Sequence, residues 1–167
     1  MGAEFELDPA DAIAVGAVGE PGHRAFYIQA RDGFRALTML VEKVQVQALA
    51  ERTMELLEGQ EVEPREEPEA LLEPVMTDWR AGEIGLGFDP ERRQLVLMAR
   101  EAPENPDTPE SELATARIWA RPAQMLALAD HGLELVSSGR PLCALCGLPI
   151  DPEGHLCPRQ NGKSPVF

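Results

Sequence analysis

Two stretches of this chain carry the same order of predicted elements, and this repetition constrains the fold more than any other feature. Each stretch holds three short apolar or alternating segments separated by turn signals, and then a segment with apolar residues at helical spacing. The stretches cover about residues 12–59 and about residues 76–139. The predicted strands are 12–18, 24–31, 34–42, 79–88, 94–101 and 113–121, and the predicted helices are 44–57 and 122 to near 139.

Residues at fixed offsets support this repetition. At an offset of 69, Gly16 corresponds to Gly85 and Val15 to Ile84, and at an offset of 79 segment 48–51 corresponds to 127–130. We interpret the agreement as an internal duplication. It predicts an α+β fold in which two three-stranded meanders form an antiparallel sheet, whose apolar face two helices cover about a pseudo-twofold axis.

The segment between the two stretches, 58–74, carries seven Glu and three Pro. This composition does not support a packed core, so we expect a mobile linker, with an acidic recognition segment as the alternative. Residues 1–139 would then form one body and residues 140–167 a separate tail. Within the second stretch, Gly82, Gly85 and Gly87 alternate through one strand, which indicates a bulge or close backbone packing.

The tail contains all three cysteines of the chain, in the spacing Cys143-x2-Cys146-x8-His155-x-Cys157. Three thiols and one imidazole make a full tetrahedral set for zinc. A set that fills all four positions leaves none for water, which is typical of structural zinc sites. The tail is therefore expected to hold one structural zinc ion through these four residues.

The cysteines admit other interpretations than a zinc site. A disulfide would leave one cysteine unpaired, and no secretory signal precedes the chain. Inert buried thiols fit poorly with a segment rich in Pro and Gly. His155 is the expected fourth ligand, and Asp151 is the alternative for that position. A deaminase zinc site also needs a His-x-Glu motif, and the sequence has none.

The net charge argues against one broad class of function, nucleic-acid binding. The chain has 15 basic and 29 acidic residues, a net charge of −14, and such a surface repels a phosphate backbone. Nucleic-acid binding is therefore not expected, although Arg140, Arg159 and Lys163 leave a basic tail as a weak third hypothesis. No apolar run approaches the roughly 20 residues of a membrane span, so a cytoplasmic protein is expected.

Repeated arginines are the other candidate functional residues. Arg24 corresponds to Arg93 and Arg31 to Arg100, and a pseudo-twofold axis would bring such pairs together into an anion pocket. The alternative is that these side chains form ion pairs on an acidic surface. Motifs for nucleophilic hydrolysis or for phosphate binding by a glycine-rich loop do not occur.

Three segments resemble an uncharacterised bacterial family, a domain of unknown function of about this length. They are VGAVGEPGHRAFYIQAR at 15–31, LVEKVQVQALAERTMELL at 40–57 and GRPLCALCGLPIDPEGHLCPRQNG at 139–162. Every position of the family's tail motif is filled, so the resemblance implies that Cys143, Cys146, His155 and Cys157 are metal ligands. The family's gene neighbours imply kinase-like or histidine-phosphatase-like protein partners.

The sequence thus leads to two hypotheses of function. The first is a non-enzymatic interaction or adaptor protein whose duplicated body presents a zinc-stapled tail to a protein partner. The second is a small enzyme, or a protein that binds an anionic metabolite, with its site between the two repeats.

Overall fold

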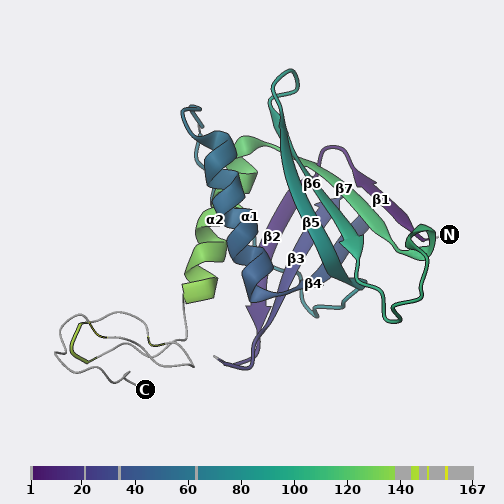
Figure 1. Cartoon of the computed structure of the whole chain (residues 1–167). Helices are drawn as coiled ribbons and strands as arrows, with labels where there is room; N and C mark the ends of the chain where they lie inside the picture. The colour runs from purple at the N-terminus through teal and green to yellow at the C-terminus, as the bar shows by residue number, and fades with distance from the viewer. Residues whose placement is uncertain are drawn as a thin grey trace.

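Seven strands form one sheet, and two helices pack side by side against it (Figure 1). The computed structural model describes residues 2–20, 22–33, 35–62, 64–137, 144–146, 150 and 157. In chain order the elements are β1 (Glu4–Leu7), β2 (Ala12–Val18), β3 (Ala25–Asp32), β4 (Arg35–Val41), α1 (Lys43–Leu57), β5 (Trp79–Asp89), β6 (Gln94–Glu101), a short 3-10 turn (Glu110–Glu112), β7 (Thr115–Ala120) and α2 (Pro122–Ser137). The α+β class predicted from the sequence is confirmed, and each predicted element lies within two residues of an observed one.

The strand order is β1-β7-β6-β5-β4-β3-β2. Strands β2, β3 and β4 pair antiparallel as one meander, and β5, β6 and β7 pair antiparallel as a second. Two parallel pairs complete the sheet, β4 with β5 and β7 with β1, so the prediction of a purely antiparallel sheet is wrong and the sheet is mixed. The order strand, strand, strand, helix therefore occurs twice along the chain.

The sheet curls round until its two edges meet. Strands β1 and β2 lie at opposite ends of the strand order, yet only residues 8–11 join them. Four residues span at most about 18 Å, whereas seven flat strands would separate the two edges by about 29 Å. Main-chain hydrogen bonds of 2.8 Å close the gap, from the Ala10 N–H to the Trp119 carbonyl of β7 and from the Asp11 N–H to the Arg31 carbonyl of β3.

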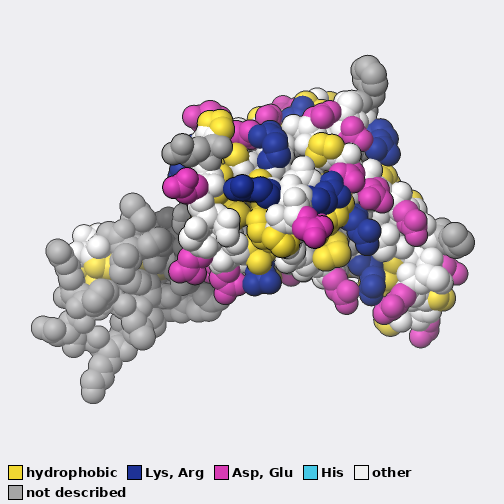
Figure 2. Space-filling model, turned by 90° about the horizontal axis from the view of Figure 1, so that it is seen from above, with side chains coloured by type: hydrophobic (Ala, Val, Ile, Leu, Met, Phe, Trp, Pro, Cys, Tyr) yellow, Lys and Arg dark blue, Asp and Glu magenta, His cyan; other side chains and the backbone are white. Residues whose placement is uncertain are grey.

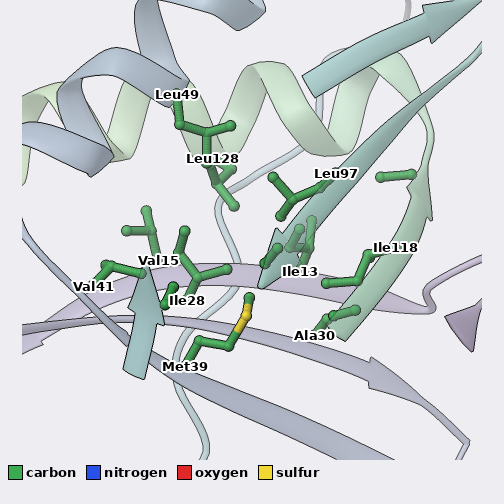
Figure 3. Packing of buried hydrophobic residues seen from close by; sticks show 14 of the residues in the cluster. Ile13, Val15, Ile28, Ala30, Met39, Val41, Leu49, Leu97, Ile118 and Leu128 are labelled. Atoms are coloured by element: carbon green, nitrogen blue, oxygen red, sulfur yellow. The ribbon is translucent and has the colours of Figure 1, made fainter. Parts of the chain in front are cut away.

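One hydrophobic core fills the inside of the curled sheet and extends beneath both helices. Ile28, Leu97 and Ile118 come from three strands of both meanders and are fully buried. Figure 3 shows these side chains pointing toward one another, with Leu49 of α1 and Leu128 of α2 entering from the helix layer. The predicted cover of the sheet's apolar face by two helices is confirmed.

The first turn of α1 contains a glutamine that ties the helix to the second meander. Gln45 Oε1 accepts a hydrogen bond of 2.8 Å from the Glu42 N–H, which caps the start of the helix. Gln45 Nε2 donates to the carbonyl oxygens of Ala81 and Gly82 at the start of β5, at 3.2 Å each.

The first turn of α2 contains a glutamine that ties this helix to the first meander in the same way. Gln124 Oε1 accepts from the Arg121 N–H at 2.8 Å, and Gln124 Nε2 donates to the carbonyl oxygens of Ala10 and Asp11, just before β2, at 3.2 Å each. Each helix is therefore fastened to the start of the other meander, α1 within β5 and α2 at the residues just before β2.

The acidic segment between α1 and β5 lies against the outer face of β2 and β3. The Leu72 N–H donates to Gln29 Oε1 at 2.8 Å, and Gln29 Nε2 donates to Thr38 Oγ1 on β4 at 3.0 Å. Leu71 sits over Gly16, where an added Cβ would lie 2.5 Å from the Leu71 side chain. The prediction of a mobile linker is therefore wrong for this part of the segment, because a few specific contacts hold it although its composition is unsuited to a core.

Ion pairs hold the same segment to the sheet and to α2. Arg31 on β3 lies 3.2 Å from Glu69, and Arg65 lies 3.7 Å from Asp130 of α2. Glu66 pairs with Arg121 at the start of α2. The segment is thus attached at both ends of its path across the outer face.

The glycine-rich strand β5 contains the expected irregularity. The pairing of β5 with β6 shifts register between Ala81 and Glu83, and a Cβ added at Gly82 would lie 3.0 Å from the Ala102 backbone. Both the bulge and the close backbone approach predicted from the glycines are present.

The register corrects one detail of the sequence match. Val15 pairs with Ile28 in the first meander, whereas Leu97 of the second pairs with Leu86 and not with Ile84. In the β5–β6 hairpin, Leu86 therefore has the pairing position that Val15 has in the β2–β3 hairpin, two residues beyond Ile84. The cause is that the turn between β5 and β6 is two residues shorter than the turn between β2 and β3.

Candidate functional site

Two of the four predicted metal ligands lie together in the described part of the tail. Cys157 and Ile150 are buried, and half-buried Cys146 packs against them. This small cluster is distinct from the core of the sheet and helices. Cys143 and His155 lie outside the described residues.

These contacts can be compared with what a shared zinc ion needs. Zinc draws thiolate ligands to within about 2.3 Å of the ion, so its cysteines must lie in one cluster. Cys146 packs against the cluster that contains Cys157 although ten residues separate the two in the chain. In the residues that the structure describes, no group of three or more His, Cys, Asp or Glu is arranged to hold a metal.

The repeated arginines are not brought into one pocket. Arg31 lies on β3 and Arg100 on β6, and β4 and β5 separate these strands in the sheet. Each side chain pairs with carboxylates of its own neighbourhood: Arg31 with Glu69, and Arg100 with Glu83 at 3.4 Å and Glu110 at 3.5 Å. These contacts agree with the second interpretation of the repeated arginines, in which they form ion pairs on the surface and not an anion pocket.

Arg24 and Arg93 also have separate surroundings. Arg24 donates to the carbonyl oxygen of Leu135 in α2 at 3.2 Å and lies 5.8 Å from the centre of the Phe26 ring. Arg93 lies in the turn between β5 and β6 with a φ of 53°, so its backbone serves the turn.

A hollow of about 570 Å³ lies on the outer face of β5, β6, β7 and β1, opposite the core. Its outward position follows from the alternation along β6 and β7, where Leu97 and Ile118 point into the core. Its charged lining residues are Glu4, Glu6, Glu83, Arg100 and Arg117, and the lining also includes Gly85, Met98 and Thr115. The hollow combines an apolar floor with charges of both signs.

The sequence predicted neither Met98 nor Arg117 as a site residue. Both stand at the alternate positions of strands whose other side chains are buried, and Met98 is 43% exposed. A methionine on the solvent side of an alternating strand was the signal that could have identified this surface.

Charges of both signs are mixed on the face of the molecule that Figure 2 shows. Figure 2 shows basic side chains scattered among acidic ones on this face, with hydrophobic side chains reaching the surface between them. This face therefore presents no broad region of one sign, although the chain as a whole carries a net charge of −14. Across the described residues, no helix combines the length and apolar character that crossing a membrane requires.

A family model places the chain among known sequences. The model described as "Protein of unknown function (DUF3090)" matches residues 5–157, a range that includes the body from residue 5 onward and all four predicted metal ligands. No curated protein and no solved structure matches the chain. The expectation of a family without an assigned activity is confirmed, and the chain belongs to the DUF3090 family of proteins of unknown function.

Proposed function

We propose that this protein is a non-enzymatic interaction protein, in which a duplicated body carries a tail folded by one structural zinc ion. The ligands would be Cys143, Cys146, His155 and Cys157. The observation that supports this proposal is the cluster of Cys146 and Cys157 with Ile150, apart from the main core. Kinase-like or histidine-phosphatase-like proteins are the candidate partners that the resemblance implies.

The donor set determines what the metal would do. Three thiolates and one imidazole fill the coordination shell of zinc, so the ion would supply folding energy to the tail. Among the described residues of the tail, Ile150 and the two cysteines are the ones that pack into a core, and a metal ion compensates where little apolar surface is buried.

Two features of the body support the duplication. Ile28 pairs with Met39 as Leu97 pairs with Ile118, so the second and third strands of the two meanders keep the same register. The reciprocal hydrogen bonds of Gln45 and Gln124 also relate each helix to the opposite meander in the same way. A pseudo-twofold relation between two βββα units accounts for both features.

Metal analysis of the purified full-length chain tests the zinc site. We expect one zinc ion per chain, lost in Cys146→Ser with the dispersed NMR signals of the tail, while the signals of the body remain. Leu145→Ala is the matched control, because Leu145 lies in the same turn and is 53% exposed. A wild-type chain purified without metal, or a Cys146→Ser chain that keeps its zinc and an intact tail, would refute the proposal.

The alternative of an anionic-metabolite site between the repeats has less support. It depends on arginines from both repeats acting together, whereas Arg31 and Arg100 are each paired with carboxylates nearby. A thermal-shift screen against phosphorylated metabolites distinguishes the two functions, because a hit lost in both Arg31→Ala and Arg100→Ala would favour the alternative.

A further inference from the structure

We propose that the outer face of the first meander, together with Arg121 at the start of α2, is a docking site for an acidic segment of a partner protein. In the free chain its own acidic segment, 64–74, occupies this site and competes with the partner. The partner segment carries two carboxylates three residues apart and a leucine two residues after the second. The proposal rests on the interaction function above and adds the chemistry of the partner, but it involves only the body and not the zinc tail.

Four consecutive contacts between the acidic segment and the body define what the site recognises. They are, in chain order, Glu66 with Arg121, Glu69 with Arg31, Leu71 with Gly16, and the Leu72 N–H with Gln29. Two arginines are thus followed by a glycine, which leaves room for a large side chain, and by an amide oxygen that accepts from the main chain. This order favours a ligand with two carboxylates and then a leucine.

The acidic segment is held loosely in this site. In 64–74 only Glu66 and Leu71 are half-buried, and the other residues are exposed. The side chains of the pair between Arg31 and Glu69 are 24% and 52% exposed, and pairs of this kind contribute little stability. A segment with so little buried surface opens at a low cost in free energy.

The face beneath the segment is suited to being uncovered. Its middle row, Ala14, Gln29 and Thr38, is small or polar, and Gly16 in the next row has no side chain. Large apolar side chains of the same strands, such as Ile28, point into the core instead. The body can therefore stay folded when the segment leaves, without exposing a broad apolar patch.

Arg31 has a hydrogen-bonding group that the acidic segment leaves unused. Its Nε atom is buried and has no hydrogen-bond partner among the described residues, while Glu69 reaches Nη2 at 3.2 Å. A carboxylate that bridges Nε and Nη2 would form a bidentate pair, which is the stronger arrangement. Because Glu66 and Leu71 hold the segment on both sides of Glu69, a separate ligand is freer to settle on Arg31 in this way.

Carboxylates of the body close to Arg31 are engaged elsewhere. Asp11 accepts from the Gly33 N–H at 2.7 Å, and Asp32 pairs with Arg35 at 2.6 Å. An anionic ligand therefore meets an arginine that these carboxylates do not neutralise.

One carboxylate of α2 adds a further preference to the site. Asp130 lies 3.7 Å from Arg65, the residue of the acidic segment just before Glu66. A basic residue before the first carboxylate would therefore also suit the partner segment.

Release of the acidic segment tests the site. A variant that combines Glu66→Ala, Glu69→Ala and Leu71→Ser removes three of the four contacts and leaves the face beneath unchanged. A fluorescent peptide with the sequence of residues 65–74, REEPEALLEP, would be titrated with the full-length protein and followed by anisotropy. We expect a Kd of about 10–100 µM for this released variant. The wild-type chain should bind about 10–100-fold more weakly, because its site is open only about 1–10% of the time.

Matched controls separate the contacts from the change in charge. Glu67→Ala combined with Glu73→Ala removes the same number of carboxylates from exposed positions of the same segment, and should leave the affinity at the wild-type value. A peptide with glutamine in place of the glutamate of position 69 and serine in place of the leucine of position 71 should bind the released variant at least about tenfold more weakly.

Further variants locate the site. Arg121→Glu and Arg31→Glu, each added to the released variant, should weaken binding at least about tenfold, because a carboxylate then faces a carboxylate of the peptide. Arg121 is 52% exposed, so Arg121→Glu should fold even if Arg31→Glu does not. Arg117→Glu is the control, since Arg117 is an exposed arginine on the outer face of the second meander, and it should leave the affinity unchanged.

The proposal is overturned if the released variant shows no saturable binding up to about 1 mM, or if it binds no better than the control variant with Glu67 and Glu73 replaced. Binding that neither Arg121→Glu nor Arg31→Glu weakens would overturn it as well. A wild-type dimer that the released variant does not form, measured by sedimentation, would make a second copy the occupant and not a partner. Cys146→Ser should not alter peptide affinity, so the docking site and the zinc site can fail independently.

Discussion

Gln45 and Gln124 make the same three hydrogen bonds from the first turns of two different helices, and each binds the meander that its own helix does not follow. An amide is suited to this position, because it can cap the helix with its oxygen while its nitrogen serves main-chain carbonyls. The two helices are thereby oriented over the sheet by polar bonds in addition to apolar packing.

Loss of the Gln124 amide should destabilise the body. Gln124 is 5% exposed, so Gln124→Ala would leave the buried carbonyl oxygen of Ala10 and the partly buried one of Asp11 without their donor. We expect the free energy of unfolding, measured by urea denaturation, to fall by about 2 kcal/mol. The control Gln47→Ala removes only an exposed contact with Glu51 and should cost less than about 0.5 kcal/mol. Equal stabilities of the two variants would contradict the role of Gln124.

A side chain at position 16 should release the acidic segment. In Gly16→Val the new Cβ would lie 2.5 Å from the Leu71 side chain, and overpacking of this size costs about 1–3 kcal/mol. Cleavage of segment 64–74 by a protease specific for glutamate should then accelerate about tenfold. Gly87→Val is the matched control, because its Cβ would have 3.6 Å to the nearest atom, on Val96. Cleavage at the wild-type rate in Gly16→Val would show that Leu71 does not anchor the segment.

A buried amide should hold the same segment more strongly than an exposed ion pair. Gln29→Ala removes the buried acceptor of the partly buried hydrogen bond from the Leu72 N–H, at a cost of about 0.5–1.5 kcal/mol. Arg31→Ala removes a pair whose side chains are 24% and 52% exposed, worth about 0–1 kcal/mol. Hydrogen exchange at the Leu72 amide should accelerate at least about tenfold in the first variant and less than about threefold in the second. The opposite order would assign the attachment to Arg31.

Arg92 should stabilise the junction where the sheet closes. Its guanidinium lies 3.7 Å from the centre of the Trp119 ring and pairs with Asp8, between β1 and β2. Arg92→Ala should lower the free energy of unfolding by about 1–2 kcal/mol and change the fluorescence of Trp119. Arg92→Lys should recover only part of this loss, because an ammonium cannot stack on the ring and pair in the same way. Full recovery by lysine would mean that charge alone matters at this position.

The local elements could be predicted from the sequence because burial follows a regular period. In β6, Leu95, Leu97 and Ala99 alternate with half-buried or exposed residues, and the predicted bounds of this strand equal the observed ones. The bonds that close the sheet carry no such signal. Ala10 and Trp119 meet through main-chain atoms, which any sequence provides.

The path of the acidic segment could not be predicted for a different reason. Its glutamates and prolines are typical of an unattached chain, whereas its position depends on one main-chain N–H, at Leu72, and on the missing side chain of Gly16. The metal ligands show the reverse situation. Their chemistry is explicit in the sequence, and of the four only Cys146 and Cys157 fall within the described residues.

The parallel pairing of β4 with β5 has a register of only two residue pairs, Met39 with Trp79 and Leu40 with Arg80. Most of the contacts that join the two halves of the body are made instead by the helices. Helix α1 packs on β5, α2 packs on β2, and the two helices pack on each other. Two molecules that traded second halves would keep all of these contacts and alter only the route of segment 64–74. The attachment of that segment to β3 therefore favours closure within one chain over domain-swapped dimerisation, and weakening it would shift the balance toward the exchanged form.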